Sequence, residues 1–196
     1  MTHSLPDVHI TLPDWAAEEL SKLPSHIPSL EDRMRTVIRF SRLNFERGTG
    51  GPFAAGVFER DTGKLVVIGV NRVTPLGCSS AHAEVVTLSV AQQMLGTWDL
   101  GGPGMPAYQL VVNWRPCAMC YGAVIWSGIR SLVIAGSGED VERVTGFDEG
   151  PMPADWIGEL TKRGITVQDG LLREEAMDVF RAFRDSGAVV YNARKG

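Results

Sequence analysis

The chain has 196 residues, of which 44% are hydrophobic and 21% are charged. This composition predicts one globular domain with a sizeable core, and no apolar run approaches the roughly 20 residues that a membrane span needs. The formal net charge of -4 argues against a basic face for phosphates, so we expect a small substrate and no nucleic-acid partner. The N-terminus lacks the features of a signal peptide, which predicts a cytoplasmic location.

Three cysteines make an odd and sparse set that does not suit a disulfide framework. In a reducing compartment, clustered cysteines more often bind metal or take part in chemistry. The close pair Cys117 and Cys120 is therefore the first candidate site.

The first 28 residues differ from the rest of the chain. Residues 1–28 contain four prolines and only short apolar patches, so we interpret them as an N-terminal extension with at most a short helix. The domain itself is assigned to residues 29–196. Its first element is a predicted helix from Leu30 to near Gly48, because apolar residues recur at helical spacing behind a possible cap at Ser29.

The elements that follow are a hairpin and then alternating helices and strands. Two apolar, partly β-branched runs flank the turn Arg60-Asp61-Thr62-Gly63 and predict an antiparallel hairpin over residues 52–71. Beyond it, patterning predicts in order a helix (80–95), a strand (108–113), a helix (118–127), a strand (131–135), a loop (136–153), a short helix, a strand (166–167) and a helix (172–186). This order predicts the α/β class, with a mixed sheet in a three-layer α/β/α arrangement.

Two short motifs open two of the predicted helices. The first is His82-Ala83-Glu84 and the second is Pro116-Cys117-Ala118-Met119-Cys120, and each follows a strand or loop. Residues two apart on a regular helix point about 200° away from each other, so His82 and Glu84 share a site more easily at a helix start. Thiols at a helix N-terminus have a lowered pKa, which prepares them for metal. The motifs therefore predict one metal site where two helix N-termini converge.

Zinc suits a ligand set of His82, Cys117 and Cys120. Three protein ligands leave the fourth tetrahedral position for water, whose pKa zinc lowers to about 7. Glu84, beside the metal, would take the proton of that water and deliver it to a ring nitrogen and then to a leaving amine. We therefore expect one zinc ion per chain and a hydrolytic deamination that releases ammonia.

Two other interpretations of the cysteines are alternatives to this catalytic ligand set. Cys117 and Cys120 could form a redox pair, although they do not lie early in a βαβ unit, where such a pair is expected. Cys78, four residues before His82, could instead complete a closed structural zinc site. Glu84 argues against a closed site, because such a site has no use for a carboxylate beside the metal.

The combination of H-x-E with P-C-x-x-C is the signature of zinc deaminases. With it the chain resembles the cytidine deaminase-like superfamily, and from about Leu30 onward it is most similar to bacterial guanine deaminases. The resemblance implies the α/β/α cytidine deaminase-like fold, zinc and a homodimer. The further segments that carry it are Gly50-Gly51-Pro52-Phe53-Ala54, Asn71, Ala123-Val124-Ile125-Trp126, Gly146-Phe147-Asp148-Glu149-Gly150-Pro151 and Tyr191-Asn192-Ala193-Arg194.

The resemblance also implies which residues bind the substrate. Phe53 would pack on the base, Asn71 would form a hydrogen bond with it, and Trp126 would line the pocket. Ala83, inside the zinc motif, is a further expected contact. Without the resemblance, Phe53 and Trp126 would be assigned to the core and Asn71 to a turn.

A second carboxylate and the C-terminal segment complete the implied site. Glu149 would help to move protons at the amino group, with Asp148 as a fallback, and a solvated acidic loop is the alternative. Tyr191 and Asn192 would close over the substrate, in some relatives from a swapped partner subunit. Many relatives carry an acidic or small polar residue just before Pro-Cys, whereas this chain has Arg115, which bears on the choice of substrate.

The leading hypothesis is hydrolytic deamination of the free base guanine to xanthine. Other small amino-heterocycles remain alternatives, namely ammeline or another s-triazine, guanosine, cytosine and cytidine. A tRNA-editing adenosine deaminase has the same core motif, but the net charge of -4 opposes it. The non-enzymatic alternative is a zinc-stabilised binding protein on the same fold, which would not need Glu84.

Overall fold

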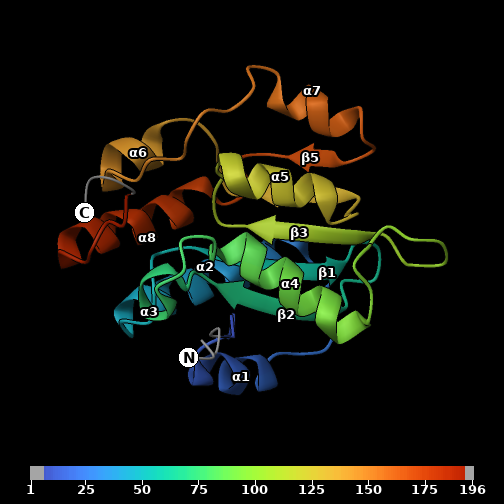
Figure 1. The fold of residues 1–196 in the computed structure, drawn as a ribbon, viewed down its shortest axis with the longest axis horizontal. Helices are drawn as coiled ribbons and strands as arrows, with labels where there is room; N and C mark the ends of the chain where they lie inside the picture. The colour runs from blue at the N-terminus through green and yellow to red at the C-terminus, as the bar shows by residue number, and fades with distance from the viewer. Residues whose placement is uncertain (1–6, 193–196) are drawn as a thin grey trace, which may run out of the picture.

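The computed structural model describes residues 7–192, and a five-stranded mixed sheet runs through its middle (Figure 1). The strand order is β2-β1-β3-β4-β5. The first two strands form the predicted antiparallel hairpin, β1 is also antiparallel to β3, and β3, β4 and β5 are parallel. The strands are β1 (Ala54–Glu59), β2 (Leu65–Val70), β3 (Tyr108–Val112), β4 (Ser131–Ile134) and β5 (Thr166–Gln168).

Helices cover both faces of the sheet. Helices α2 and α8 share one core with the strands, while α4, α5 and α7 share the other, and α4 and α5 lie on the side of the sheet that Figure 1 shows in front. The predicted three-layer α/β/α fold is therefore confirmed. Within residues 7–192 no helix is long and apolar enough to cross a membrane. The helices are α1 (Asp14–Ser21), α2 (Leu30–Glu46), α3 (Val73–Leu76), α4 (Ala83–Leu95), α5 (Ala118–Trp126), α6 (Asp140–Thr145), α7 (Trp156–Thr161) and α8 (Arg173–Ser186).

The central strands bury side chains on both faces. In β3, Leu110 and Val112 belong to the core with α4 and α5, whereas Val111 belongs to the core with α2 and α8. Successive side chains of a strand point to opposite faces, so a strand that is apolar at every position needs a helix layer on each side. This is why the near-continuous apolar runs of the sequence produce three layers.

Helix α4 begins slightly later than the hydrophobic pattern predicts, whereas α5 begins at Ala118 as predicted. Helix α4 starts at Ala83 and not at residue 80, with His82 at its cap in extended conformation (φ -68°, ψ 156°). Cys117 occupies the same place before α5 (φ -67°, ψ 173°). Because His82 lies outside the helix and Glu84 in its first turn, the regular 200° separation does not apply, and both can face one site.

Two short helices were not predicted. Helix α6 lies inside the segment 136–153, which the sequence pattern assigns to a loop, and α3 begins two residues after Asn71. Helices this short do not stand alone in water and depend on tertiary packing. For α6 that packing is against α8, with Val141 fully buried in their shared core.

Candidate active site

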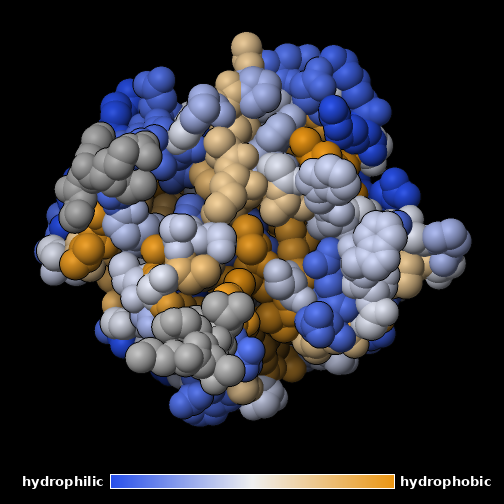
Figure 2. Space-filling model, in the orientation of Figure 1, coloured by the Kyte–Doolittle hydropathy of each residue, from blue (hydrophilic) through white to orange (hydrophobic). Residues whose placement is uncertain are grey.

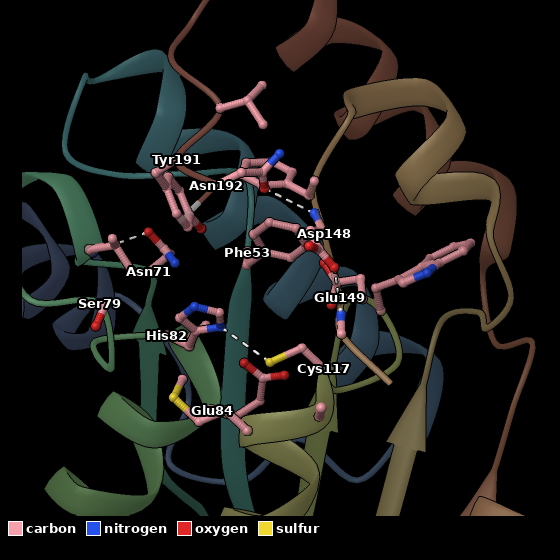
Figure 3. A pocket seen from close by; sticks show the side chains of 18 of the residues that line it. Phe53, Asn71, Ser79, His82, Glu84, Cys117, Asp148, Glu149, Tyr191 and Asn192 are labelled. Atoms are coloured by element: carbon pink, nitrogen blue, oxygen red, sulfur yellow. Dashed lines mark hydrogen bonds between the residues drawn. The ribbon is translucent and has the colours of Figure 1, made fainter. Parts of the chain in front are cut away.

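Strand ends and helix starts meet at one edge of the sheet. Phe53 precedes β1 and Asn71 follows β2, and the Asn71 backbone N–H donates to the Phe53 carbonyl at 3.0 Å. The end of β3 lies beside them, since Ala55 pairs with Val112. Together with the N-termini of α4 and α5, these elements enclose a cavity of about 630 Å³ (Figure 3). That volume is within the range of small-molecule sites.

The three predicted metal ligands come together beside this cavity. One ligand atom each from His82, Cys117 and Cys120 lies within 4.8 Å of the others, and this is the one such group found among the described residues. The distance from Cys117 Sγ to His82 Nδ1 is 3.5 Å. Cys78 lies outside the group, and its Sγ instead contacts Ser80 Oγ at 3.3 Å. The geometry therefore joins the two motifs and does not support a site that includes Cys78.

The cluster fits zinc. Zinc bonds of about 2.3 Å to sulfur and 2.0 to 2.1 Å to nitrogen, at tetrahedral angles, separate two ligand atoms by about 3.6 Å, which the 3.5 Å between Cys117 and His82 matches. His82 and Cys117 also line the cavity, so a fourth position can face a substrate. A bound zinc ion would there act as a Lewis acid and activate water.

The two thiols are prepared for a metal to different degrees. A hydrogen bond from Cys120, with a smaller contribution from His82, lowers the pKa of Cys117 to about 4. The same hydrogen bond, together with burial, raises the pKa of Cys120. Both sulfurs must be deprotonated to bind zinc, so binding of a divalent cation would favour loss of the Cys120 proton.

Two carboxyl groups face the same cavity. Glu84 is 6% exposed and Glu149 is 9% exposed, and both line the cavity. Burial, followed by the negative charge of Cys117, raises the pKa of Glu84 to about 7 and that of Glu149 to about 8. Groups with pKa values near neutrality are suited to proton transfer. In Figure 3 Glu84 lies beneath His82 and Cys117, whereas Glu149 approaches from another side.

The amide of Asn71 has a defined orientation. Its Oδ1 accepts hydrogen bonds from the backbone N–H groups of Gly51 at 3.2 Å and Val73 at 3.3 Å. Both of these partners are donors, so Nδ2 is left to point into the cavity (Figure 3). Asn71 thus forms the local turn contacts that are expected without the resemblance, and it also lines the cavity, as the resemblance implies. Phe53 lines the same cavity, and its ring packs at 5.2 Å against that of Phe147.

Tyr191 lies over the cluster, from the same chain. Its ring centroid is 6.2 Å from that of His82 and 4.9 Å from that of Phe147. The Tyr191 hydroxyl is buried and has no hydrogen-bond partner within the described residues. A buried hydroxyl without a partner is costly, so this oxygen is available to a ligand.

Asn192 also lines the cavity, but its side-chain amide is hydrogen-bonded to the backbone of a loop. Oδ1 accepts from the Asp148 backbone N–H at 3.0 Å and Nδ2 donates to the Gly146 carbonyl at 2.7 Å. Asn192 thus holds the loop that carries Glu149. The other two residues of the predicted C-terminal segment, Ala193 and Arg194, lie outside the described residues.

Trp126 does not line the cavity, so that prediction is wrong. It is the last residue of α5 and is 82% exposed. Six residues after Cys120, it lies about 240° further round the helix and about 9 Å along its axis, which turns it away from the cluster. Ala83, in contrast, is buried and lines the cavity as expected.

The cavity also has lining residues that were not among the predicted site residues. Arg115, which the sequence marked as unusual, is one of the lining residues, and its buried Nε has no partner in the described part of the chain. Phe147 directly precedes the predicted residues Asp148 and Glu149, and this position is the sequence feature that could have identified it as a lining residue. The others include Val73, Ser79, Trp114, Val189 and Val190.

Residues 29–136 match the family described as the cytidine and deoxycytidylate deaminase zinc-binding region. That is more than half of the chain. The chain belongs to this family. The predicted superfamily and the zinc-deaminase class are therefore confirmed, and the His82-Cys117-Cys120 cluster is the zinc-type donor set of this deaminase.

Solved structures resemble this deaminase over almost its whole length. One, described as a guanine deaminase from Nitrosomonas europaea, is 48% identical, with a TM-score of 0.87 over 93% of this chain and 99% of that chain. Another is a complex with 2,6-diaminopurine at 49% identity, with a TM-score of 0.88 over 96% of this chain and 98% of that chain. Guanine deaminase of Bacillus subtilis is 34% identical over 102 residues, which are 52% of this chain and 60% of that relative.

Proposed function

We propose that this deaminase hydrolyses guanine to xanthine and ammonia. The observation that carries the proposal is the second buried carboxyl, Glu149, which faces the same cavity as Glu84 and the zinc-type cluster. Solved relatives at 48 to 49% identity are described as a guanine deaminase and as a complex with 2,6-diaminopurine, and both support a purine base as substrate. One zinc ion per chain is part of the proposal.

The two carboxyl groups divide the proton transfers between them. Glu84, beside the cluster, accepts the proton of the attacking water and passes it to the ring nitrogen next to the amino-bearing carbon. Glu149, on another side of the cavity, supplies a proton to the departing amine and regains one from the remaining hydroxyl of the attacking water as the carbonyl of xanthine forms. Asp148 suits this role less well, because it is exposed and its Oδ1 accepts from the Gly150 N–H at 3.0 Å.

The remaining cavity residues hold the base. The Asn71 amide offers a donor to a carbonyl oxygen or ring nitrogen of the base, and Phe53 packs against its plane. Tyr191 closes the cavity over it, with a hydroxyl that has no other partner among the described residues. Ala83 contributes a small buried surface beside the cluster. Asn192 supports the site through the loop at Asp148.

The experiment that tests the proposal is an ammonia-release assay across guanine, 2,6-diaminopurine, guanosine, cytosine, cytidine, adenine and ammeline. We expect kcat/KM for guanine to exceed that for the pyrimidines by about 10² or more, because a site with fixed polar groups rejects a base that leaves them unpaired. Preference for another compound would reassign the substrate. Release of ammonia from none of them would refute the proposal and favour a binding protein.

We also propose a cytoplasmic homodimer without a nucleic-acid partner, in which residues 29–196 form the deaminase domain. The thiols of the cluster need a reducing compartment, and the net charge of -4 disfavours phosphate binding. The face that α4 and α5 cover has apolar side chains exposed along its middle (Figure 2). Met94, Trp98 and Trp126 are 62 to 82% exposed, and a second copy would bury them. Light scattering of the purified chain tests the dimer.

A further inference from the structure

Asn44, in the last part of α2, is a polar side chain on the buried side of its helix. It is 0% exposed and follows the fully buried Val37, Phe40 and Ser41 along the same helix. Its Nδ2 donates two hydrogen bonds of 2.8 Å, one to the Gly51 carbonyl and one to the Asn71 carbonyl. The side chain thus joins α2 to both segments that orient the Asn71 amide.

A second set of contacts holds Asn44 from the other side. The Thr49 hydroxyl lies 2.9 Å from Asn44 Oδ1 and 3.1 Å from its carbonyl oxygen, to which it can donate. The same hydroxyl accepts a hydrogen bond of 3.0 Å from Trp15 Nε1 in α1. The guanidinium of Arg47 lies 5.1 Å from the Trp15 ring, which holds that ring in place. A chain of side-chain contacts therefore leads from the N-terminal segment to Asn71.

The backbone next to Asn44 is closely packed and leaves no room for a side chain at Gly50. Gly50 has a φ of +152°, and a Cβ there would lie 1.9 Å from the Asn71 carbonyl oxygen and 2.6 Å from Asn44 Nδ2. The Gly51 N–H in turn donates to Asn71 Oδ1 at 3.2 Å. Gly51 is thus held by Asn44 at its carbonyl and by Asn71 at its N–H, so a shift of one asparagine moves the contacts of the other.

We propose that Asn44 is a positioning residue that sets the direction of the Asn71 amide, and that Trp15 and Thr49 hold Asn44 in place. The proposal rests on the role of Asn71 in base recognition given above. It assigns a purpose to part of the N-terminal extension, since Trp15 lies within residues 1–28. Asn44 itself does not line the cavity, so its effect on the substrate is indirect.

A double-mutant cycle on the zinc-loaded protein tests whether Asn44 acts through Asn71. We expect Asn44→Ala to lower kcat/KM for guanine about tenfold, mainly through KM, because a base contact with a misdirected amide is weakened. In an Asn71→Ala background the same change should cost less than about twofold, since coupled residues are non-additive. Losses that multiply in the double variant would overturn the proposal.

A matched control separates positioning from loss of stability. Ser41 is a fully buried polar residue of the same helix whose hydroxyl bonds only the Ile38 carbonyl at 2.7 Å, so Ser41→Ala should leave kcat/KM within about twofold of the wild type. If Asn44→Ala does not fold, Trp15→Phe replaces it, because it removes the N–H to Thr49 while it keeps an aromatic ring at that position. That variant should raise KM about threefold.

Hydrogen exchange supplies a readout that does not depend on turnover. Peptides that cover residues 48–56 and 66–73 should exchange faster in Asn44→Ala and Trp15→Phe than in the wild type or in Ser41→Ala. Unchanged exchange in these peptides would overturn the positioning role. If the wild type did not deaminate guanine, the proposed substrate would fail, while this measurement would still decide how Asn44 acts on the Asn71 segment.

Discussion

Replacing Glu84 with alanine is expected to lower kcat for deamination by at least about 10²-fold while zinc content and fold are retained. This is the usual contribution of a positioned acid-base group. Glu84 is 6% exposed, lines the cavity and lies outside the group of three metal-type ligands. Ammonia release measures the rate, elemental analysis the zinc, and thermal unfolding the fold.

Two further variants distinguish the roles of the two carboxyl groups in proton transfer. Glu84→Gln keeps the size of the side chain and should be almost as inactive as Glu84→Ala, because an amide cannot carry the proton. Glu149→Gln should lose about 10 to 10²-fold, since its role is to assist at the amino group. Full activity in Glu84→Ala, with zinc present, would refute the proposed mechanism.

Replacing Cys120 with alanine is expected to remove both zinc and activity. The Cys120 thiol is 0% exposed and lies within 4.8 Å of the ligand atoms of His82 and Cys117. Two remaining ligands make a much weaker site, so zinc should fall well below one half per chain and the rate by more than about 10³-fold. Elemental analysis after dialysis, followed by the guanine assay, measures both effects.

Cys78 provides the matched control for this experiment. It is a cysteine of the same chain, four residues before His82, but lies outside the cluster, with its Sγ 3.3 Å from Ser80 Oγ. Cys78→Ala should keep zinc near one per chain and full activity. A zinc-free Cys78→Ala protein would instead support a closed structural site, and zinc retained in Cys120→Ala would contradict the assigned ligand set.

The chemistry of the site could be predicted from the sequence because its key residues lie in short motifs. His82 and Glu84 are two positions apart, and Cys117 and Cys120 three, so local helix geometry determines how each pair is presented. The same holds for the fold class, since near-continuously apolar strands, alternating with helices, require a covered sheet. The predicted sheet, hairpin and layers are all present.

Contacts between distant segments were decided by the tertiary structure alone. Asn44 and Asn71 are 27 positions apart and Trp15 and Thr49 are 34 apart, and no local periodicity links such pairs. A polar residue on the apolar side of α2 was the one available signal for Asn44. Trp126 shows the converse, because a tryptophan on a helix suggests burial, yet the end of α5 turns it outward. Local spacing thus determined which groups can react, and packing determined which groups hold them in place.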